Sequence, residues 1–311
     1  ICSGNTVTVN IAGSQAGINY ELFDGVTSLS SPVAGTGGAI NLITSALTAN
    51  TTITVRATNP TTSCTTLLSG TSVVTVTPIP ATPVVTPAGP VTVCEGAANI
   101  TLTSDAASGN QWYKDGVQIG GATATTLNIT TTPGNSGSYT VISTVSGCAS
   151  AVSNAVAVTI NALPLTTPVV TPATTTICSG NTVTVNIAGS QAGINYELFN
   201  GVTSLSSAVA GTGGAINIVS TALTANTTIT VRATNPTTSC TTLLSGTSVV
   251  TVTPIPSTPV VTPAGPVTVC EGAANITLTS DAASGNQWYK DGVLIGGATA
   301  TTLNITTTPG N

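Results

Sequence analysis

The 311-residue chain contains no His and no Met, and only 4% of its residues are charged and 3% aromatic. Without His, neither a Ser-His-Asp nor a Cys-His catalytic arrangement is available. Four Lys and Arg residues are too few for the basic surface that binds nucleic acid or anionic lipid. No apolar run approaches the roughly 18 residues of a membrane-spanning helix. We therefore predict no enzyme, no nucleic-acid partner and no membrane insertion by this segment.

The residues that fill the chain are those typical of β-strands. Thr, Val, Ala, Ser, Asn and Ile dominate, whereas the Leu, Lys, Glu and Arg that usually cover helix surfaces are scarce. Short alternating segments such as Thr51–Thr58 are separated by Gly, Pro and Asn turns and show no helical period. The last strand of the first domain is expected over Thr71–Thr77. This pattern predicts an all-β chain of antiparallel β-sandwiches.

An internal repeat of 176 residues organises the chain. Residues 177–311 match residues 1–135 with eight differences, nearly all of them conservative. The segment Thr82–Ala88, which has two prolines around Val-Val-Thr, recurs as Thr167–Ala173 and Thr258–Ala264. Proline holds itself and the residue before it in extended conformations, so we expect a stiff connector that becomes the first strand of the next domain.

These junctions predict four domains of two alternating types, arranged as an extended rod. The first type covers residues 1–81 and 167–257, and the second covers residues 82–166 and 258–311, with the last domain cut short. Because the chain starts and stops inside repeats, we expect it to be a window from a longer protein. Near-identical copies favour a spacer or a multivalent surface, since an enzyme gains little from a second copy of itself.

Seven cysteines are distributed over the predicted domains, two in each complete one. Pairing in sequence order gives one disulfide per complete domain, namely Cys2–Cys64, Cys94–Cys148 and Cys178–Cys240, with Cys270 left over. By the repeat, the partner of the last cysteine lies beyond the end of the chain. Disulfides imply export to an oxidising compartment, and each loop closed here contributes about 4 kcal/mol. With no CxxC spacing and no His, we predict no metal site and no cofactor.

The second domain type carries two motifs on predicted strands. Residues 112–116 read Trp-Tyr-Lys-Asp-Gly, in which Asp-Gly favours a tight hairpin, and residues 137–141 read Gly-Ser-Tyr-Thr-Val. Together they resemble an immunoglobulin-like domain. The resemblance implies that Trp112 is the core tryptophan, with Trp288 as its copy, and that Tyr139 is the tyrosine-corner residue.

The cysteines depart from that family's pattern. Val141 occupies the position of the family's strand cysteine, whereas Cys94 lies near the first strand and Cys148 before the last one. We expect a bridge that staples the first strands to the hairpin before the last strand. The Cys-Glu-Gly start and Ser-Gly-Cys ending resemble Ig-like repeats of large surface proteins of the Bacteroidota, including gliding-type adhesins exported by the type 9 secretion system. That resemblance implies an extracellular location on a bacterial cell surface.

Signals for chemistry are weak in this sequence. The nine carboxylates are isolated, and Asp24 becomes Asn200 in the second copy, which argues against the carboxylate pair of a glycosidase. Asp105 or Glu95 with backbone carbonyls suggests a weak cation site, for which a solvated turn carboxylate is the simpler interpretation. The two tryptophans would serve as sugar-stacking platforms if exposed, and their mid-domain strand positions favour the core instead.

The sequence thus favours a non-enzymatic stalk, the repeat region of a large bacterial cell-surface adhesin. It would extend a distal tip or present many weak contacts, with neighbouring domains of the same long chain as partners and surface glycans as candidate ligands. Two alternatives stay open. A self-assembling extracellular filament of identical chains is favoured by the scarcity of surface charge. A carbohydrate-binding array on a secreted enzyme would need exposed aromatic residues, of which the chain has few.

Overall fold

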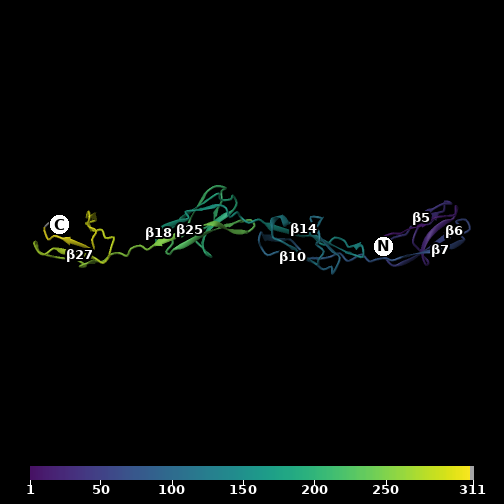
Figure 1. The fold of residues 1–311 in the computed structure, drawn as a ribbon, viewed down its shortest axis with the longest axis horizontal. Helices are drawn as coiled ribbons and strands as arrows, with labels where there is room; N and C mark the ends of the chain where they lie inside the picture. The colour runs from purple at the N-terminus through teal and green to yellow at the C-terminus, as the bar shows by residue number, and fades with distance from the viewer. Residues whose placement is uncertain (309–311) are drawn as a thin grey trace. The chain divides into compact units, whose positions relative to one another are not determined.

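The structure, a computed structural model, describes residues 1–308, and nearly all of its regular secondary structure is β-strand (Figure 1). In this range the helical content is one short 3-10 helix, η1 (Pro133–Asn135), and no helix has the length and hydropathy needed to cross a membrane. The chain divides into two compact units. The first comprises residues 1–166 together with 193–195 and 233–243, and the second takes the other described residues from 167 on.

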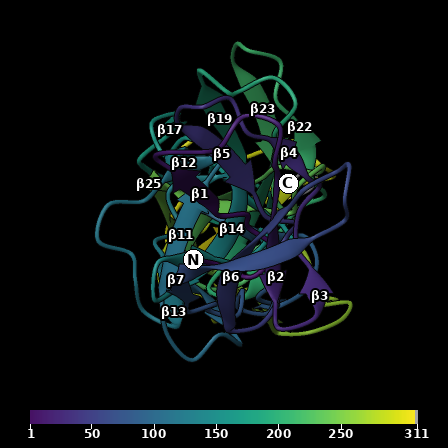
Figure 2. The same cartoon turned by 90° about the vertical axis from the view of Figure 1, so that its right-hand side faces the viewer.

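Residues 1–81 form a sandwich of two antiparallel sheets. One sheet pairs β1 (Thr8–Ile11) with β5 (Ile40–Ile43). The other has the order β3-β2-β6-β7 with β4 beside β2, and Figure 2 shows β7, β6, β2 and β3 following one another in that order. The remaining bounds are β2 Asn19–Asp24, β3 Thr27–Ser28, β4 Val33–Ala34, β6 Thr51–Thr58 and β7 Thr65–Val74.

The core of this first sandwich follows from the alternation of side chains along its strands. On β6, Ile53 and Val55 are buried, while the threonine and arginine between and after them are not. Leu22 and Leu42, from opposite sheets, are fully buried in the same cluster. Each such side chain removed from water contributes about 1.5–3 kcal/mol, so a few aliphatic residues suffice where aromatic ones are scarce.

Residues 82–166 form a second sandwich. One sheet has the order β13-β10-β8, and the other has the order β12-β11-β14-β16-β9 with β15 beside β14. The bounds are β8 Val85–Thr86, β9 Val91–Cys94, β10 Ile100–Ser104, β11 Asn110–Lys114, β12 Val117–Gln118, β13 Thr126–Ile129, β14 Gly137–Val145, β15 Cys148–Ala149 and β16 Val156–Asn161.

The first strand of the second sandwich is split between its two sheets. Its first half, β8, pairs antiparallel with β10, and its second half, β9, pairs parallel with the last strand, β16. With β10 and β13 on one side and β11, β14 and β16 on the other, this is the strand order of an immunoglobulin-like sandwich. The predicted all-β, immunoglobulin-like fold class is confirmed.

The motif residues of the second sandwich lie at its centre. Trp112 on β11 pairs with Val141 on β14, is 0% exposed, and donates its indole N–H to the carbonyl oxygen of Ala124 at 2.9 Å. Tyr139 is 3% exposed, and its hydroxyl donates to the carbonyl oxygen of Asn135, four residues upstream, at 2.7 Å. This contact is a tyrosine corner. Both aromatic side chains therefore bury apolar surface and keep their polar atoms paired.

The Asp-Gly hairpin forms as predicted. Lys114 on β11 pairs with Val117 on β12 across a two-residue turn, in which Asp115 (φ 50°) and Gly116 (φ 78°) both have positive φ. The Asp115 carboxylate also accepts the backbone N–H of Ser138 at 2.8 Å. One of the few charged residues thus fixes the start of β14 relative to this turn.

All three proline junctions become first strands. The segments β8, β17 (Val169–Thr171) and β26 (Val261–Thr262) pair antiparallel with β10, β19 and β27, respectively. In each one the Thr–Pro peptide bond after the strand is cis. The expectation that the connector continues into a strand is confirmed.

Residues 167–257 repeat the first plan, with sheets β17-β19-β23 and β18-β25-β24-β20-β21, and β22 beside β20. Here too the second half of the first strand, β18, runs parallel to the last strand, β25. The bounds are β18 Thr174–Cys178, β19 Thr184–Ala188, β20 Asn195–Asn200, β21 Thr203–Ser204, β22 Val209–Ala210, β23 Ile216–Val219, β24 Thr227–Thr234 and β25 Thr241–Thr253.

The last segment, up to residue 308, contains a three-stranded sheet, β26-β27-β30, and a two-stranded one, β28-β29. The bounds are β27 Ile276–Ser280, β28 Tyr289–Lys290, β29 Val293–Leu294 and β30 Thr302–Ile305. Trp288 precedes β28 and is 9% exposed.

One strand differs from its predicted bounds. The last strand of the first sandwich, β7, begins at Thr65 and ends at Val74, whereas the sequence pattern predicted Thr71–Thr77. β7 lies at the edge of its sheet, and both of its faces are largely exposed. An edge strand of this kind lacks the alternation of apolar and polar residues that identifies half-buried strands.

Replacing Trp112 by Ala removes the largest buried side chain of the second sandwich. We expect a loss of about 3–5 kcal/mol in the free energy of unfolding, measured by denaturant titration with far-UV circular dichroism. Val117→Ala, on the same hairpin at a side chain that is 71% exposed, is the matched control and should change stability by less than about 0.5 kcal/mol. Full stability together with lost sugar binding in Trp112→Ala would show that Trp112 is a ligand platform.

Candidate functional site

The carboxylates do not converge on a common point. Among residues 1–308 no group of three or more Cys, Asp or Glu side chains is placed to hold a metal ion. Glu21 pairs with Arg56 at 3.4 Å, and the guanidinium of Arg56 also stacks on Phe23, 3.7 Å from the ring centroid. The same ion pair recurs in the third sandwich between Glu197 and Arg232 at 3.2 Å. These charges hold neighbouring strands together.

The two carboxylates considered for a cation accept backbone N–H groups instead. Asp105 accepts the N–H of Val84 at 2.7 Å, which fixes the junction against the second sandwich. Glu95 accepts the N–H of Leu163 at 3.4 Å. Both side chains therefore act as local braces at the ends of strands.

Grooves are present where a sandwich lacks a strand. The groove beside Trp288, about 660 Å³, is lined by Leu278, Ile295 and Leu303. In the second sandwich the equivalent tryptophan is covered by β14, so this groove is the open face of a core. A groove of about 350 Å³ beside Gly70 in the first sandwich corresponds to the surface that β17 covers at Gly246 in the third.

The feature that distinguishes the chain is its disulfides. Cys2 bonds to Cys148, and Cys94 bonds to Cys240, with Cα atoms 5.6 Å apart in both pairs and a sequence separation of 146 in both. Each bond joins a cysteine of one sandwich to a cysteine of the following sandwich. The predicted in-order pairing, with one disulfide inside each sandwich, is wrong.

The strand pairing explains why the first sandwich cannot close its own disulfide. Cys2 pairs with Thr77, just beyond the end of β7, whereas Cys64 directly precedes Thr65, where β7 begins. Twelve residues of extended chain separate these two levels, or about 40 Å at 3.3 Å per residue. Cys2 and Cys64 are therefore at opposite ends of the sheet, far beyond the roughly 7 Å that a disulfide allows between Cα atoms.

The second sandwich has the same constraint. Cys94 is level with Asn161 at the end of β16, while Cys148 pairs with Val145 at the far end of β14. Val158 on β16 lies opposite Gly137, the start of β14, and Asn161 lies three residues further along β16. The two cysteines are therefore separated by about eleven residues of extended chain, or about 36 Å. The predicted Cys94–Cys148 staple between the first strands and the hairpin is excluded by this distance.

The cysteines therefore fall into two structural classes. The first-strand cysteines lie beside the end of the last strand, and the turn cysteines lie in the turn just before the last strand. The first-strand class comprises Cys2, Cys94 and Cys178, to which Cys270 is assigned as the repeat equivalent of Cys94, and the turn class comprises Cys64, Cys148 and Cys240. Both disulfides join a first-strand cysteine to the turn cysteine of the next sandwich.

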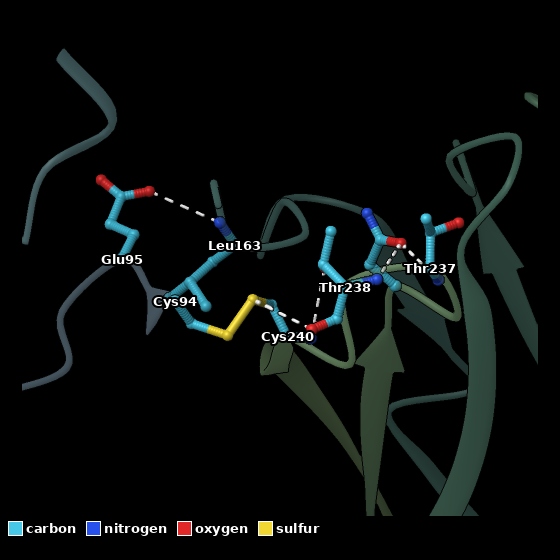
Figure 3. Close-up of a disulfide and its surroundings, with 7 residues drawn as sticks. Cys94, Glu95, Leu163, Thr237, Thr238 and Cys240 are labelled. Carbon is cyan, nitrogen blue, oxygen red and sulfur yellow. Dashed lines mark hydrogen bonds between the residues drawn. A yellow bond between two sulfur atoms is a disulfide. The ribbon is translucent and has the colours of Figure 1, made fainter. Parts of the chain in front are cut away.

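Local contacts support both bridges. The turn that carries Cys148 lies against the end of the first sandwich, with its sulfur atom 3.9 Å from the carbonyl oxygen of Thr77. At the second bridge, Figure 3 shows Cys94 bonded to Cys240 between Leu163 and Thr238. The backbone N–H of Cys240 donates to the hydroxyl of Thr238 at 3.4 Å, which fixes the turn.

Three cysteines carry thiols, namely Cys64, Cys178 and Cys270, and all three are exposed. The in-order partners predicted for the first two, Cys2 and Cys240, are bonded to other cysteines. Sequence spacing does not single out the observed pairing. Joining a first-strand cysteine to the turn cysteine of the next sandwich gives a constant separation of 146, and joining a turn cysteine to the following first-strand cysteine also gives a constant separation, 30.

No protein-family model and no curated protein sequence matches the chain. Among solved structures, the I-band fragment I67-I69 from titin is similar at 12% identity, with 81% of this chain and 94% of that chain covered and a TM-score of 0.44. The ICAM-5 D1-D4 ectodomain fragment is similar at 16% identity, with 81% and 73% covered and a TM-score of 0.38. The N-terminal four Ig domains of Dscam1 isoform 6.9 are similar at 11% identity, with 81% of this chain and 70% of that chain covered and a TM-score of 0.27. The fold assignment rests on the strand order described above.

Tyr139→Phe tests the tyrosine corner. Burial, and secondarily the Asp115 carboxylate, raise the pKa of Tyr139 above its ordinary value, so folding favours the neutral phenol. The stability this contributes is present below the ordinary pKa and is lost as pH rises through the raised one. We expect Tyr139→Phe to lose about 0.5–1.5 kcal/mol near neutral pH and to show a smaller alkaline decline than the unmodified chain.

The measurement is denaturant unfolding across pH 7–11, with Tyr289→Phe, at a largely exposed tyrosine, as the control. An unchanged stability at neutral pH in Tyr139→Phe would contradict the proposed role of the hydroxyl–carbonyl hydrogen bond.

Proposed function

We propose that this chain is a non-enzymatic structural stalk, built from immunoglobulin-like sandwiches that are locked in series by disulfides. The observation that carries the proposal is the disulfide pairing, because Cys2–Cys148 and Cys94–Cys240 each tie one sandwich to the next. A disulfide inside a domain protects that domain alone. A disulfide between domains restrains the linker as well, which is the part of a multidomain chain that yields first.

The chemistry of the rest of the chain supports a structural role. The carboxylates of Glu21 and Glu197 form ion pairs, those of Asp105 and Glu95 accept backbone N–H groups, and Trp112 is buried in a core. Sugar binding through the tryptophans is thereby disfavoured. The disulfides support an oxidising, extracellular location.

We further propose that the stalk belongs to a large bacterial cell-surface adhesin of the Bacteroidota type. The support is the set of sequence motifs that such repeats share, namely the Cys-Glu-Gly start, the Trp-Tyr-Lys-Asp-Gly middle and the Ser-Gly-Cys ending. In that setting the stalk extends a distal binding tip from the cell surface and bears the load on it. The alternative of a self-assembling filament is supported by a separate observation, the scarcity of charged residues, which make up 4% of the chain.

Interlaced disulfides have a mechanical consequence. Tension between the two chain ends follows the shortest covalent path, which crosses Cys2–Cys148, runs back along residues 94–148, and crosses Cys94–Cys240. This path holds about 126 backbone steps in place of about 310, so full extension falls from about 1,090 Å to about 440 Å at ~3.5 Å per residue. The chain would therefore resist overextension even when its sandwiches unfold.

Single-molecule force spectroscopy on the chain, held at its two ends, tests this limit. We expect a maximal extension of about 440 Å when oxidised and about 1,090 Å after reduction. The double variant Cys2→Ser/Cys148→Ser keeps the Cys94–Cys240 disulfide between sandwiches and should extend to about 570 Å. In-order pairing would instead allow about 870 Å in that variant, because only a Cys178–Cys240 bridge would remain. The longer value would sink the proposal.

A further inference from the structure

The hairpin between β20 and β21 carries the one difference in charge between the two copies of the repeat. At the 176-residue period Asn200 corresponds to Asp24, and the other seven differences between residues 1–135 and 177–311 exchange uncharged residues. Each of these two residues precedes a glycine, Gly201 or Gly25. Asn200–Gly201 is the one Asn-Gly dipeptide in the sequence.

The backbone of this hairpin is the same in both copies. β20 pairs with β21 in the register in which β2 pairs with β3, so two residues form the turn in each case. The first turn residue is the glycine, with φ 59° at Gly201 and 56° at Gly25. Glycine adopts positive φ without steric cost and is favoured at the first position of such a turn. The hairpin therefore accepts either an amide or a carboxylate before its glycine.

The end of the hairpin is open to solvent. Asn200 and Gly201 are exposed, and Val202 is 96% exposed. In the part of the chain that the structure describes, neither the side-chain amide of Asn200 nor the backbone N–H of Gly201 has a hydrogen-bond partner. Apart from its chain neighbours, nothing lies within 4 Å of the position that a Cβ would take at Gly201. The amide and the following backbone nitrogen are therefore free to approach each other.

Other asparagines are held in place or crowded. The side-chain amide of Asn135 donates to the carbonyl oxygen and to the hydroxyl of Thr130 at 2.9 and 2.7 Å. Asn186 donates its amide to Asn217 across the sheet at 2.8 Å and is followed by a β-branched isoleucine. A branched side chain on the following residue hinders its backbone nitrogen, whereas glycine has no side chain. Asn200 combines a free amide with an unhindered neighbour.

We propose that Asn200 is a site of spontaneous covalent modification, at which the side-chain amide becomes a carboxylate through a succinimide formed with the backbone of Gly201. The reaction needs no enzyme and no cofactor, and asparagine is among the thermolabile residues of proteins. The proposal rests on the hairpin and its exposure to solvent, and it does not require the stalk function.

The reaction balances with water as the other reactant. The backbone nitrogen of Gly201 gives up its proton and attacks Cγ of Asn200, so an N–Cγ bond forms, the Cγ–Nδ2 bond breaks and ammonia leaves. Water then opens the five-membered ring at either of its carbonyl carbons. Opening at Cγ gives aspartate with the original backbone, and opening at the main-chain carbonyl gives isoaspartate. The sum is asparagine plus water to acid plus ammonia, with no oxidation or reduction.

The conversion would give the third sandwich the charge that the first sandwich already has. Aspartate at position 24 shows that a carboxylate at this corner leaves the strand pairing of the hairpin unchanged. The isoaspartate product instead carries one additional methylene in the backbone at the end of β20. The charge of the chain would thus become more negative with time, beside the exposed side chain of Val202.

The test keeps the folded, disulfide-bonded chain in mildly alkaline buffer at physiological temperature and samples it over several weeks. Each sample is reduced, cleaved at its basic residues and analysed by mass spectrometry, which locates the amide-to-acid mass increase within residues 115–232. Isoaspartate is measured by methyl transfer from S-adenosylmethionine with an isoaspartyl methyltransferase. We expect acid and isoaspartate to accumulate at Asn200, while Asn186 and Asn217 keep their amides.

Two variants serve as matched controls. Asp24→Asn creates a second Asn-Gly hairpin of the same geometry and should gain a second reactive site, at position 24. Asn200→Gln should lose the reaction, because its longer side chain would have to close a six-membered ring. This variant also measures the background of isoaspartate that arises at the Asp-Gly dipeptides of the chain.

Four results would overturn the proposal. An amide at Asn200 that reacts only in denaturant would show that the folded hairpin protects it. Acid without isoaspartate above the level of Asn200→Gln would show direct hydrolysis in place of the succinimide. Equal conversion at Asn186 or Asn217 would show that the hairpin confers no reactivity. An Asp24→Asn chain that gains no second site would show the same.

Discussion

The length of a β-sandwich is the constraint on which this architecture depends. The first-strand cysteine and the turn cysteine of one sandwich lie at opposite ends of the same sheet, about 36–40 Å apart. A disulfide spans no more than about 7 Å between Cα atoms, so neither cysteine can bond within its own domain. The first-strand cysteine lies at the end where the chain leaves the sandwich, and the turn cysteine lies at the end where the chain enters. Each cysteine is therefore placed to bond with a cysteine of a neighbouring sandwich.

Charge is used sparingly in this chain, and each charged residue described above has a local structural task. Arg56 bridges Glu21 and covers Phe23, Asp115 fixes the start of β14, and Asp105 holds the junction strand. Threonine and serine occupy the solvent-facing positions that charged residues take in most proteins. The sandwiches therefore depend on aliphatic alternation, a few buried aromatic residues such as Tyr20, Trp112 and Tyr139, and covalent cross-links for their stability.

Local patterns in the sequence predicted much of the fold. Alternation identified β6, the Asp-Gly pair predicted the β11–β12 hairpin, and the proline junctions predicted the first strands. The edge strand β7 was misplaced because its exposed faces carry no alternation. The disulfide pairing was missed for a different reason. It depends on which end of a sheet each cysteine occupies, and that follows from the parallel pairing of first and last strands, which sequence spacing does not reveal.

Disulfide mapping of the intact chain is the most direct test of this account. After thiol blocking, cleavage at the four basic residues, Arg56, Lys114, Arg232 and Lys290, leaves the seven cysteines in four fragments. Disulfides between sandwiches predict two separate pairs of linked fragments, residues 1–56 with 115–232 and residues 57–114 with 233–290. Bonds within each sandwich would join all four fragments into one species. Finding two pairs of linked fragments would support disulfides between sandwiches, and finding all four fragments linked in a single species would contradict them.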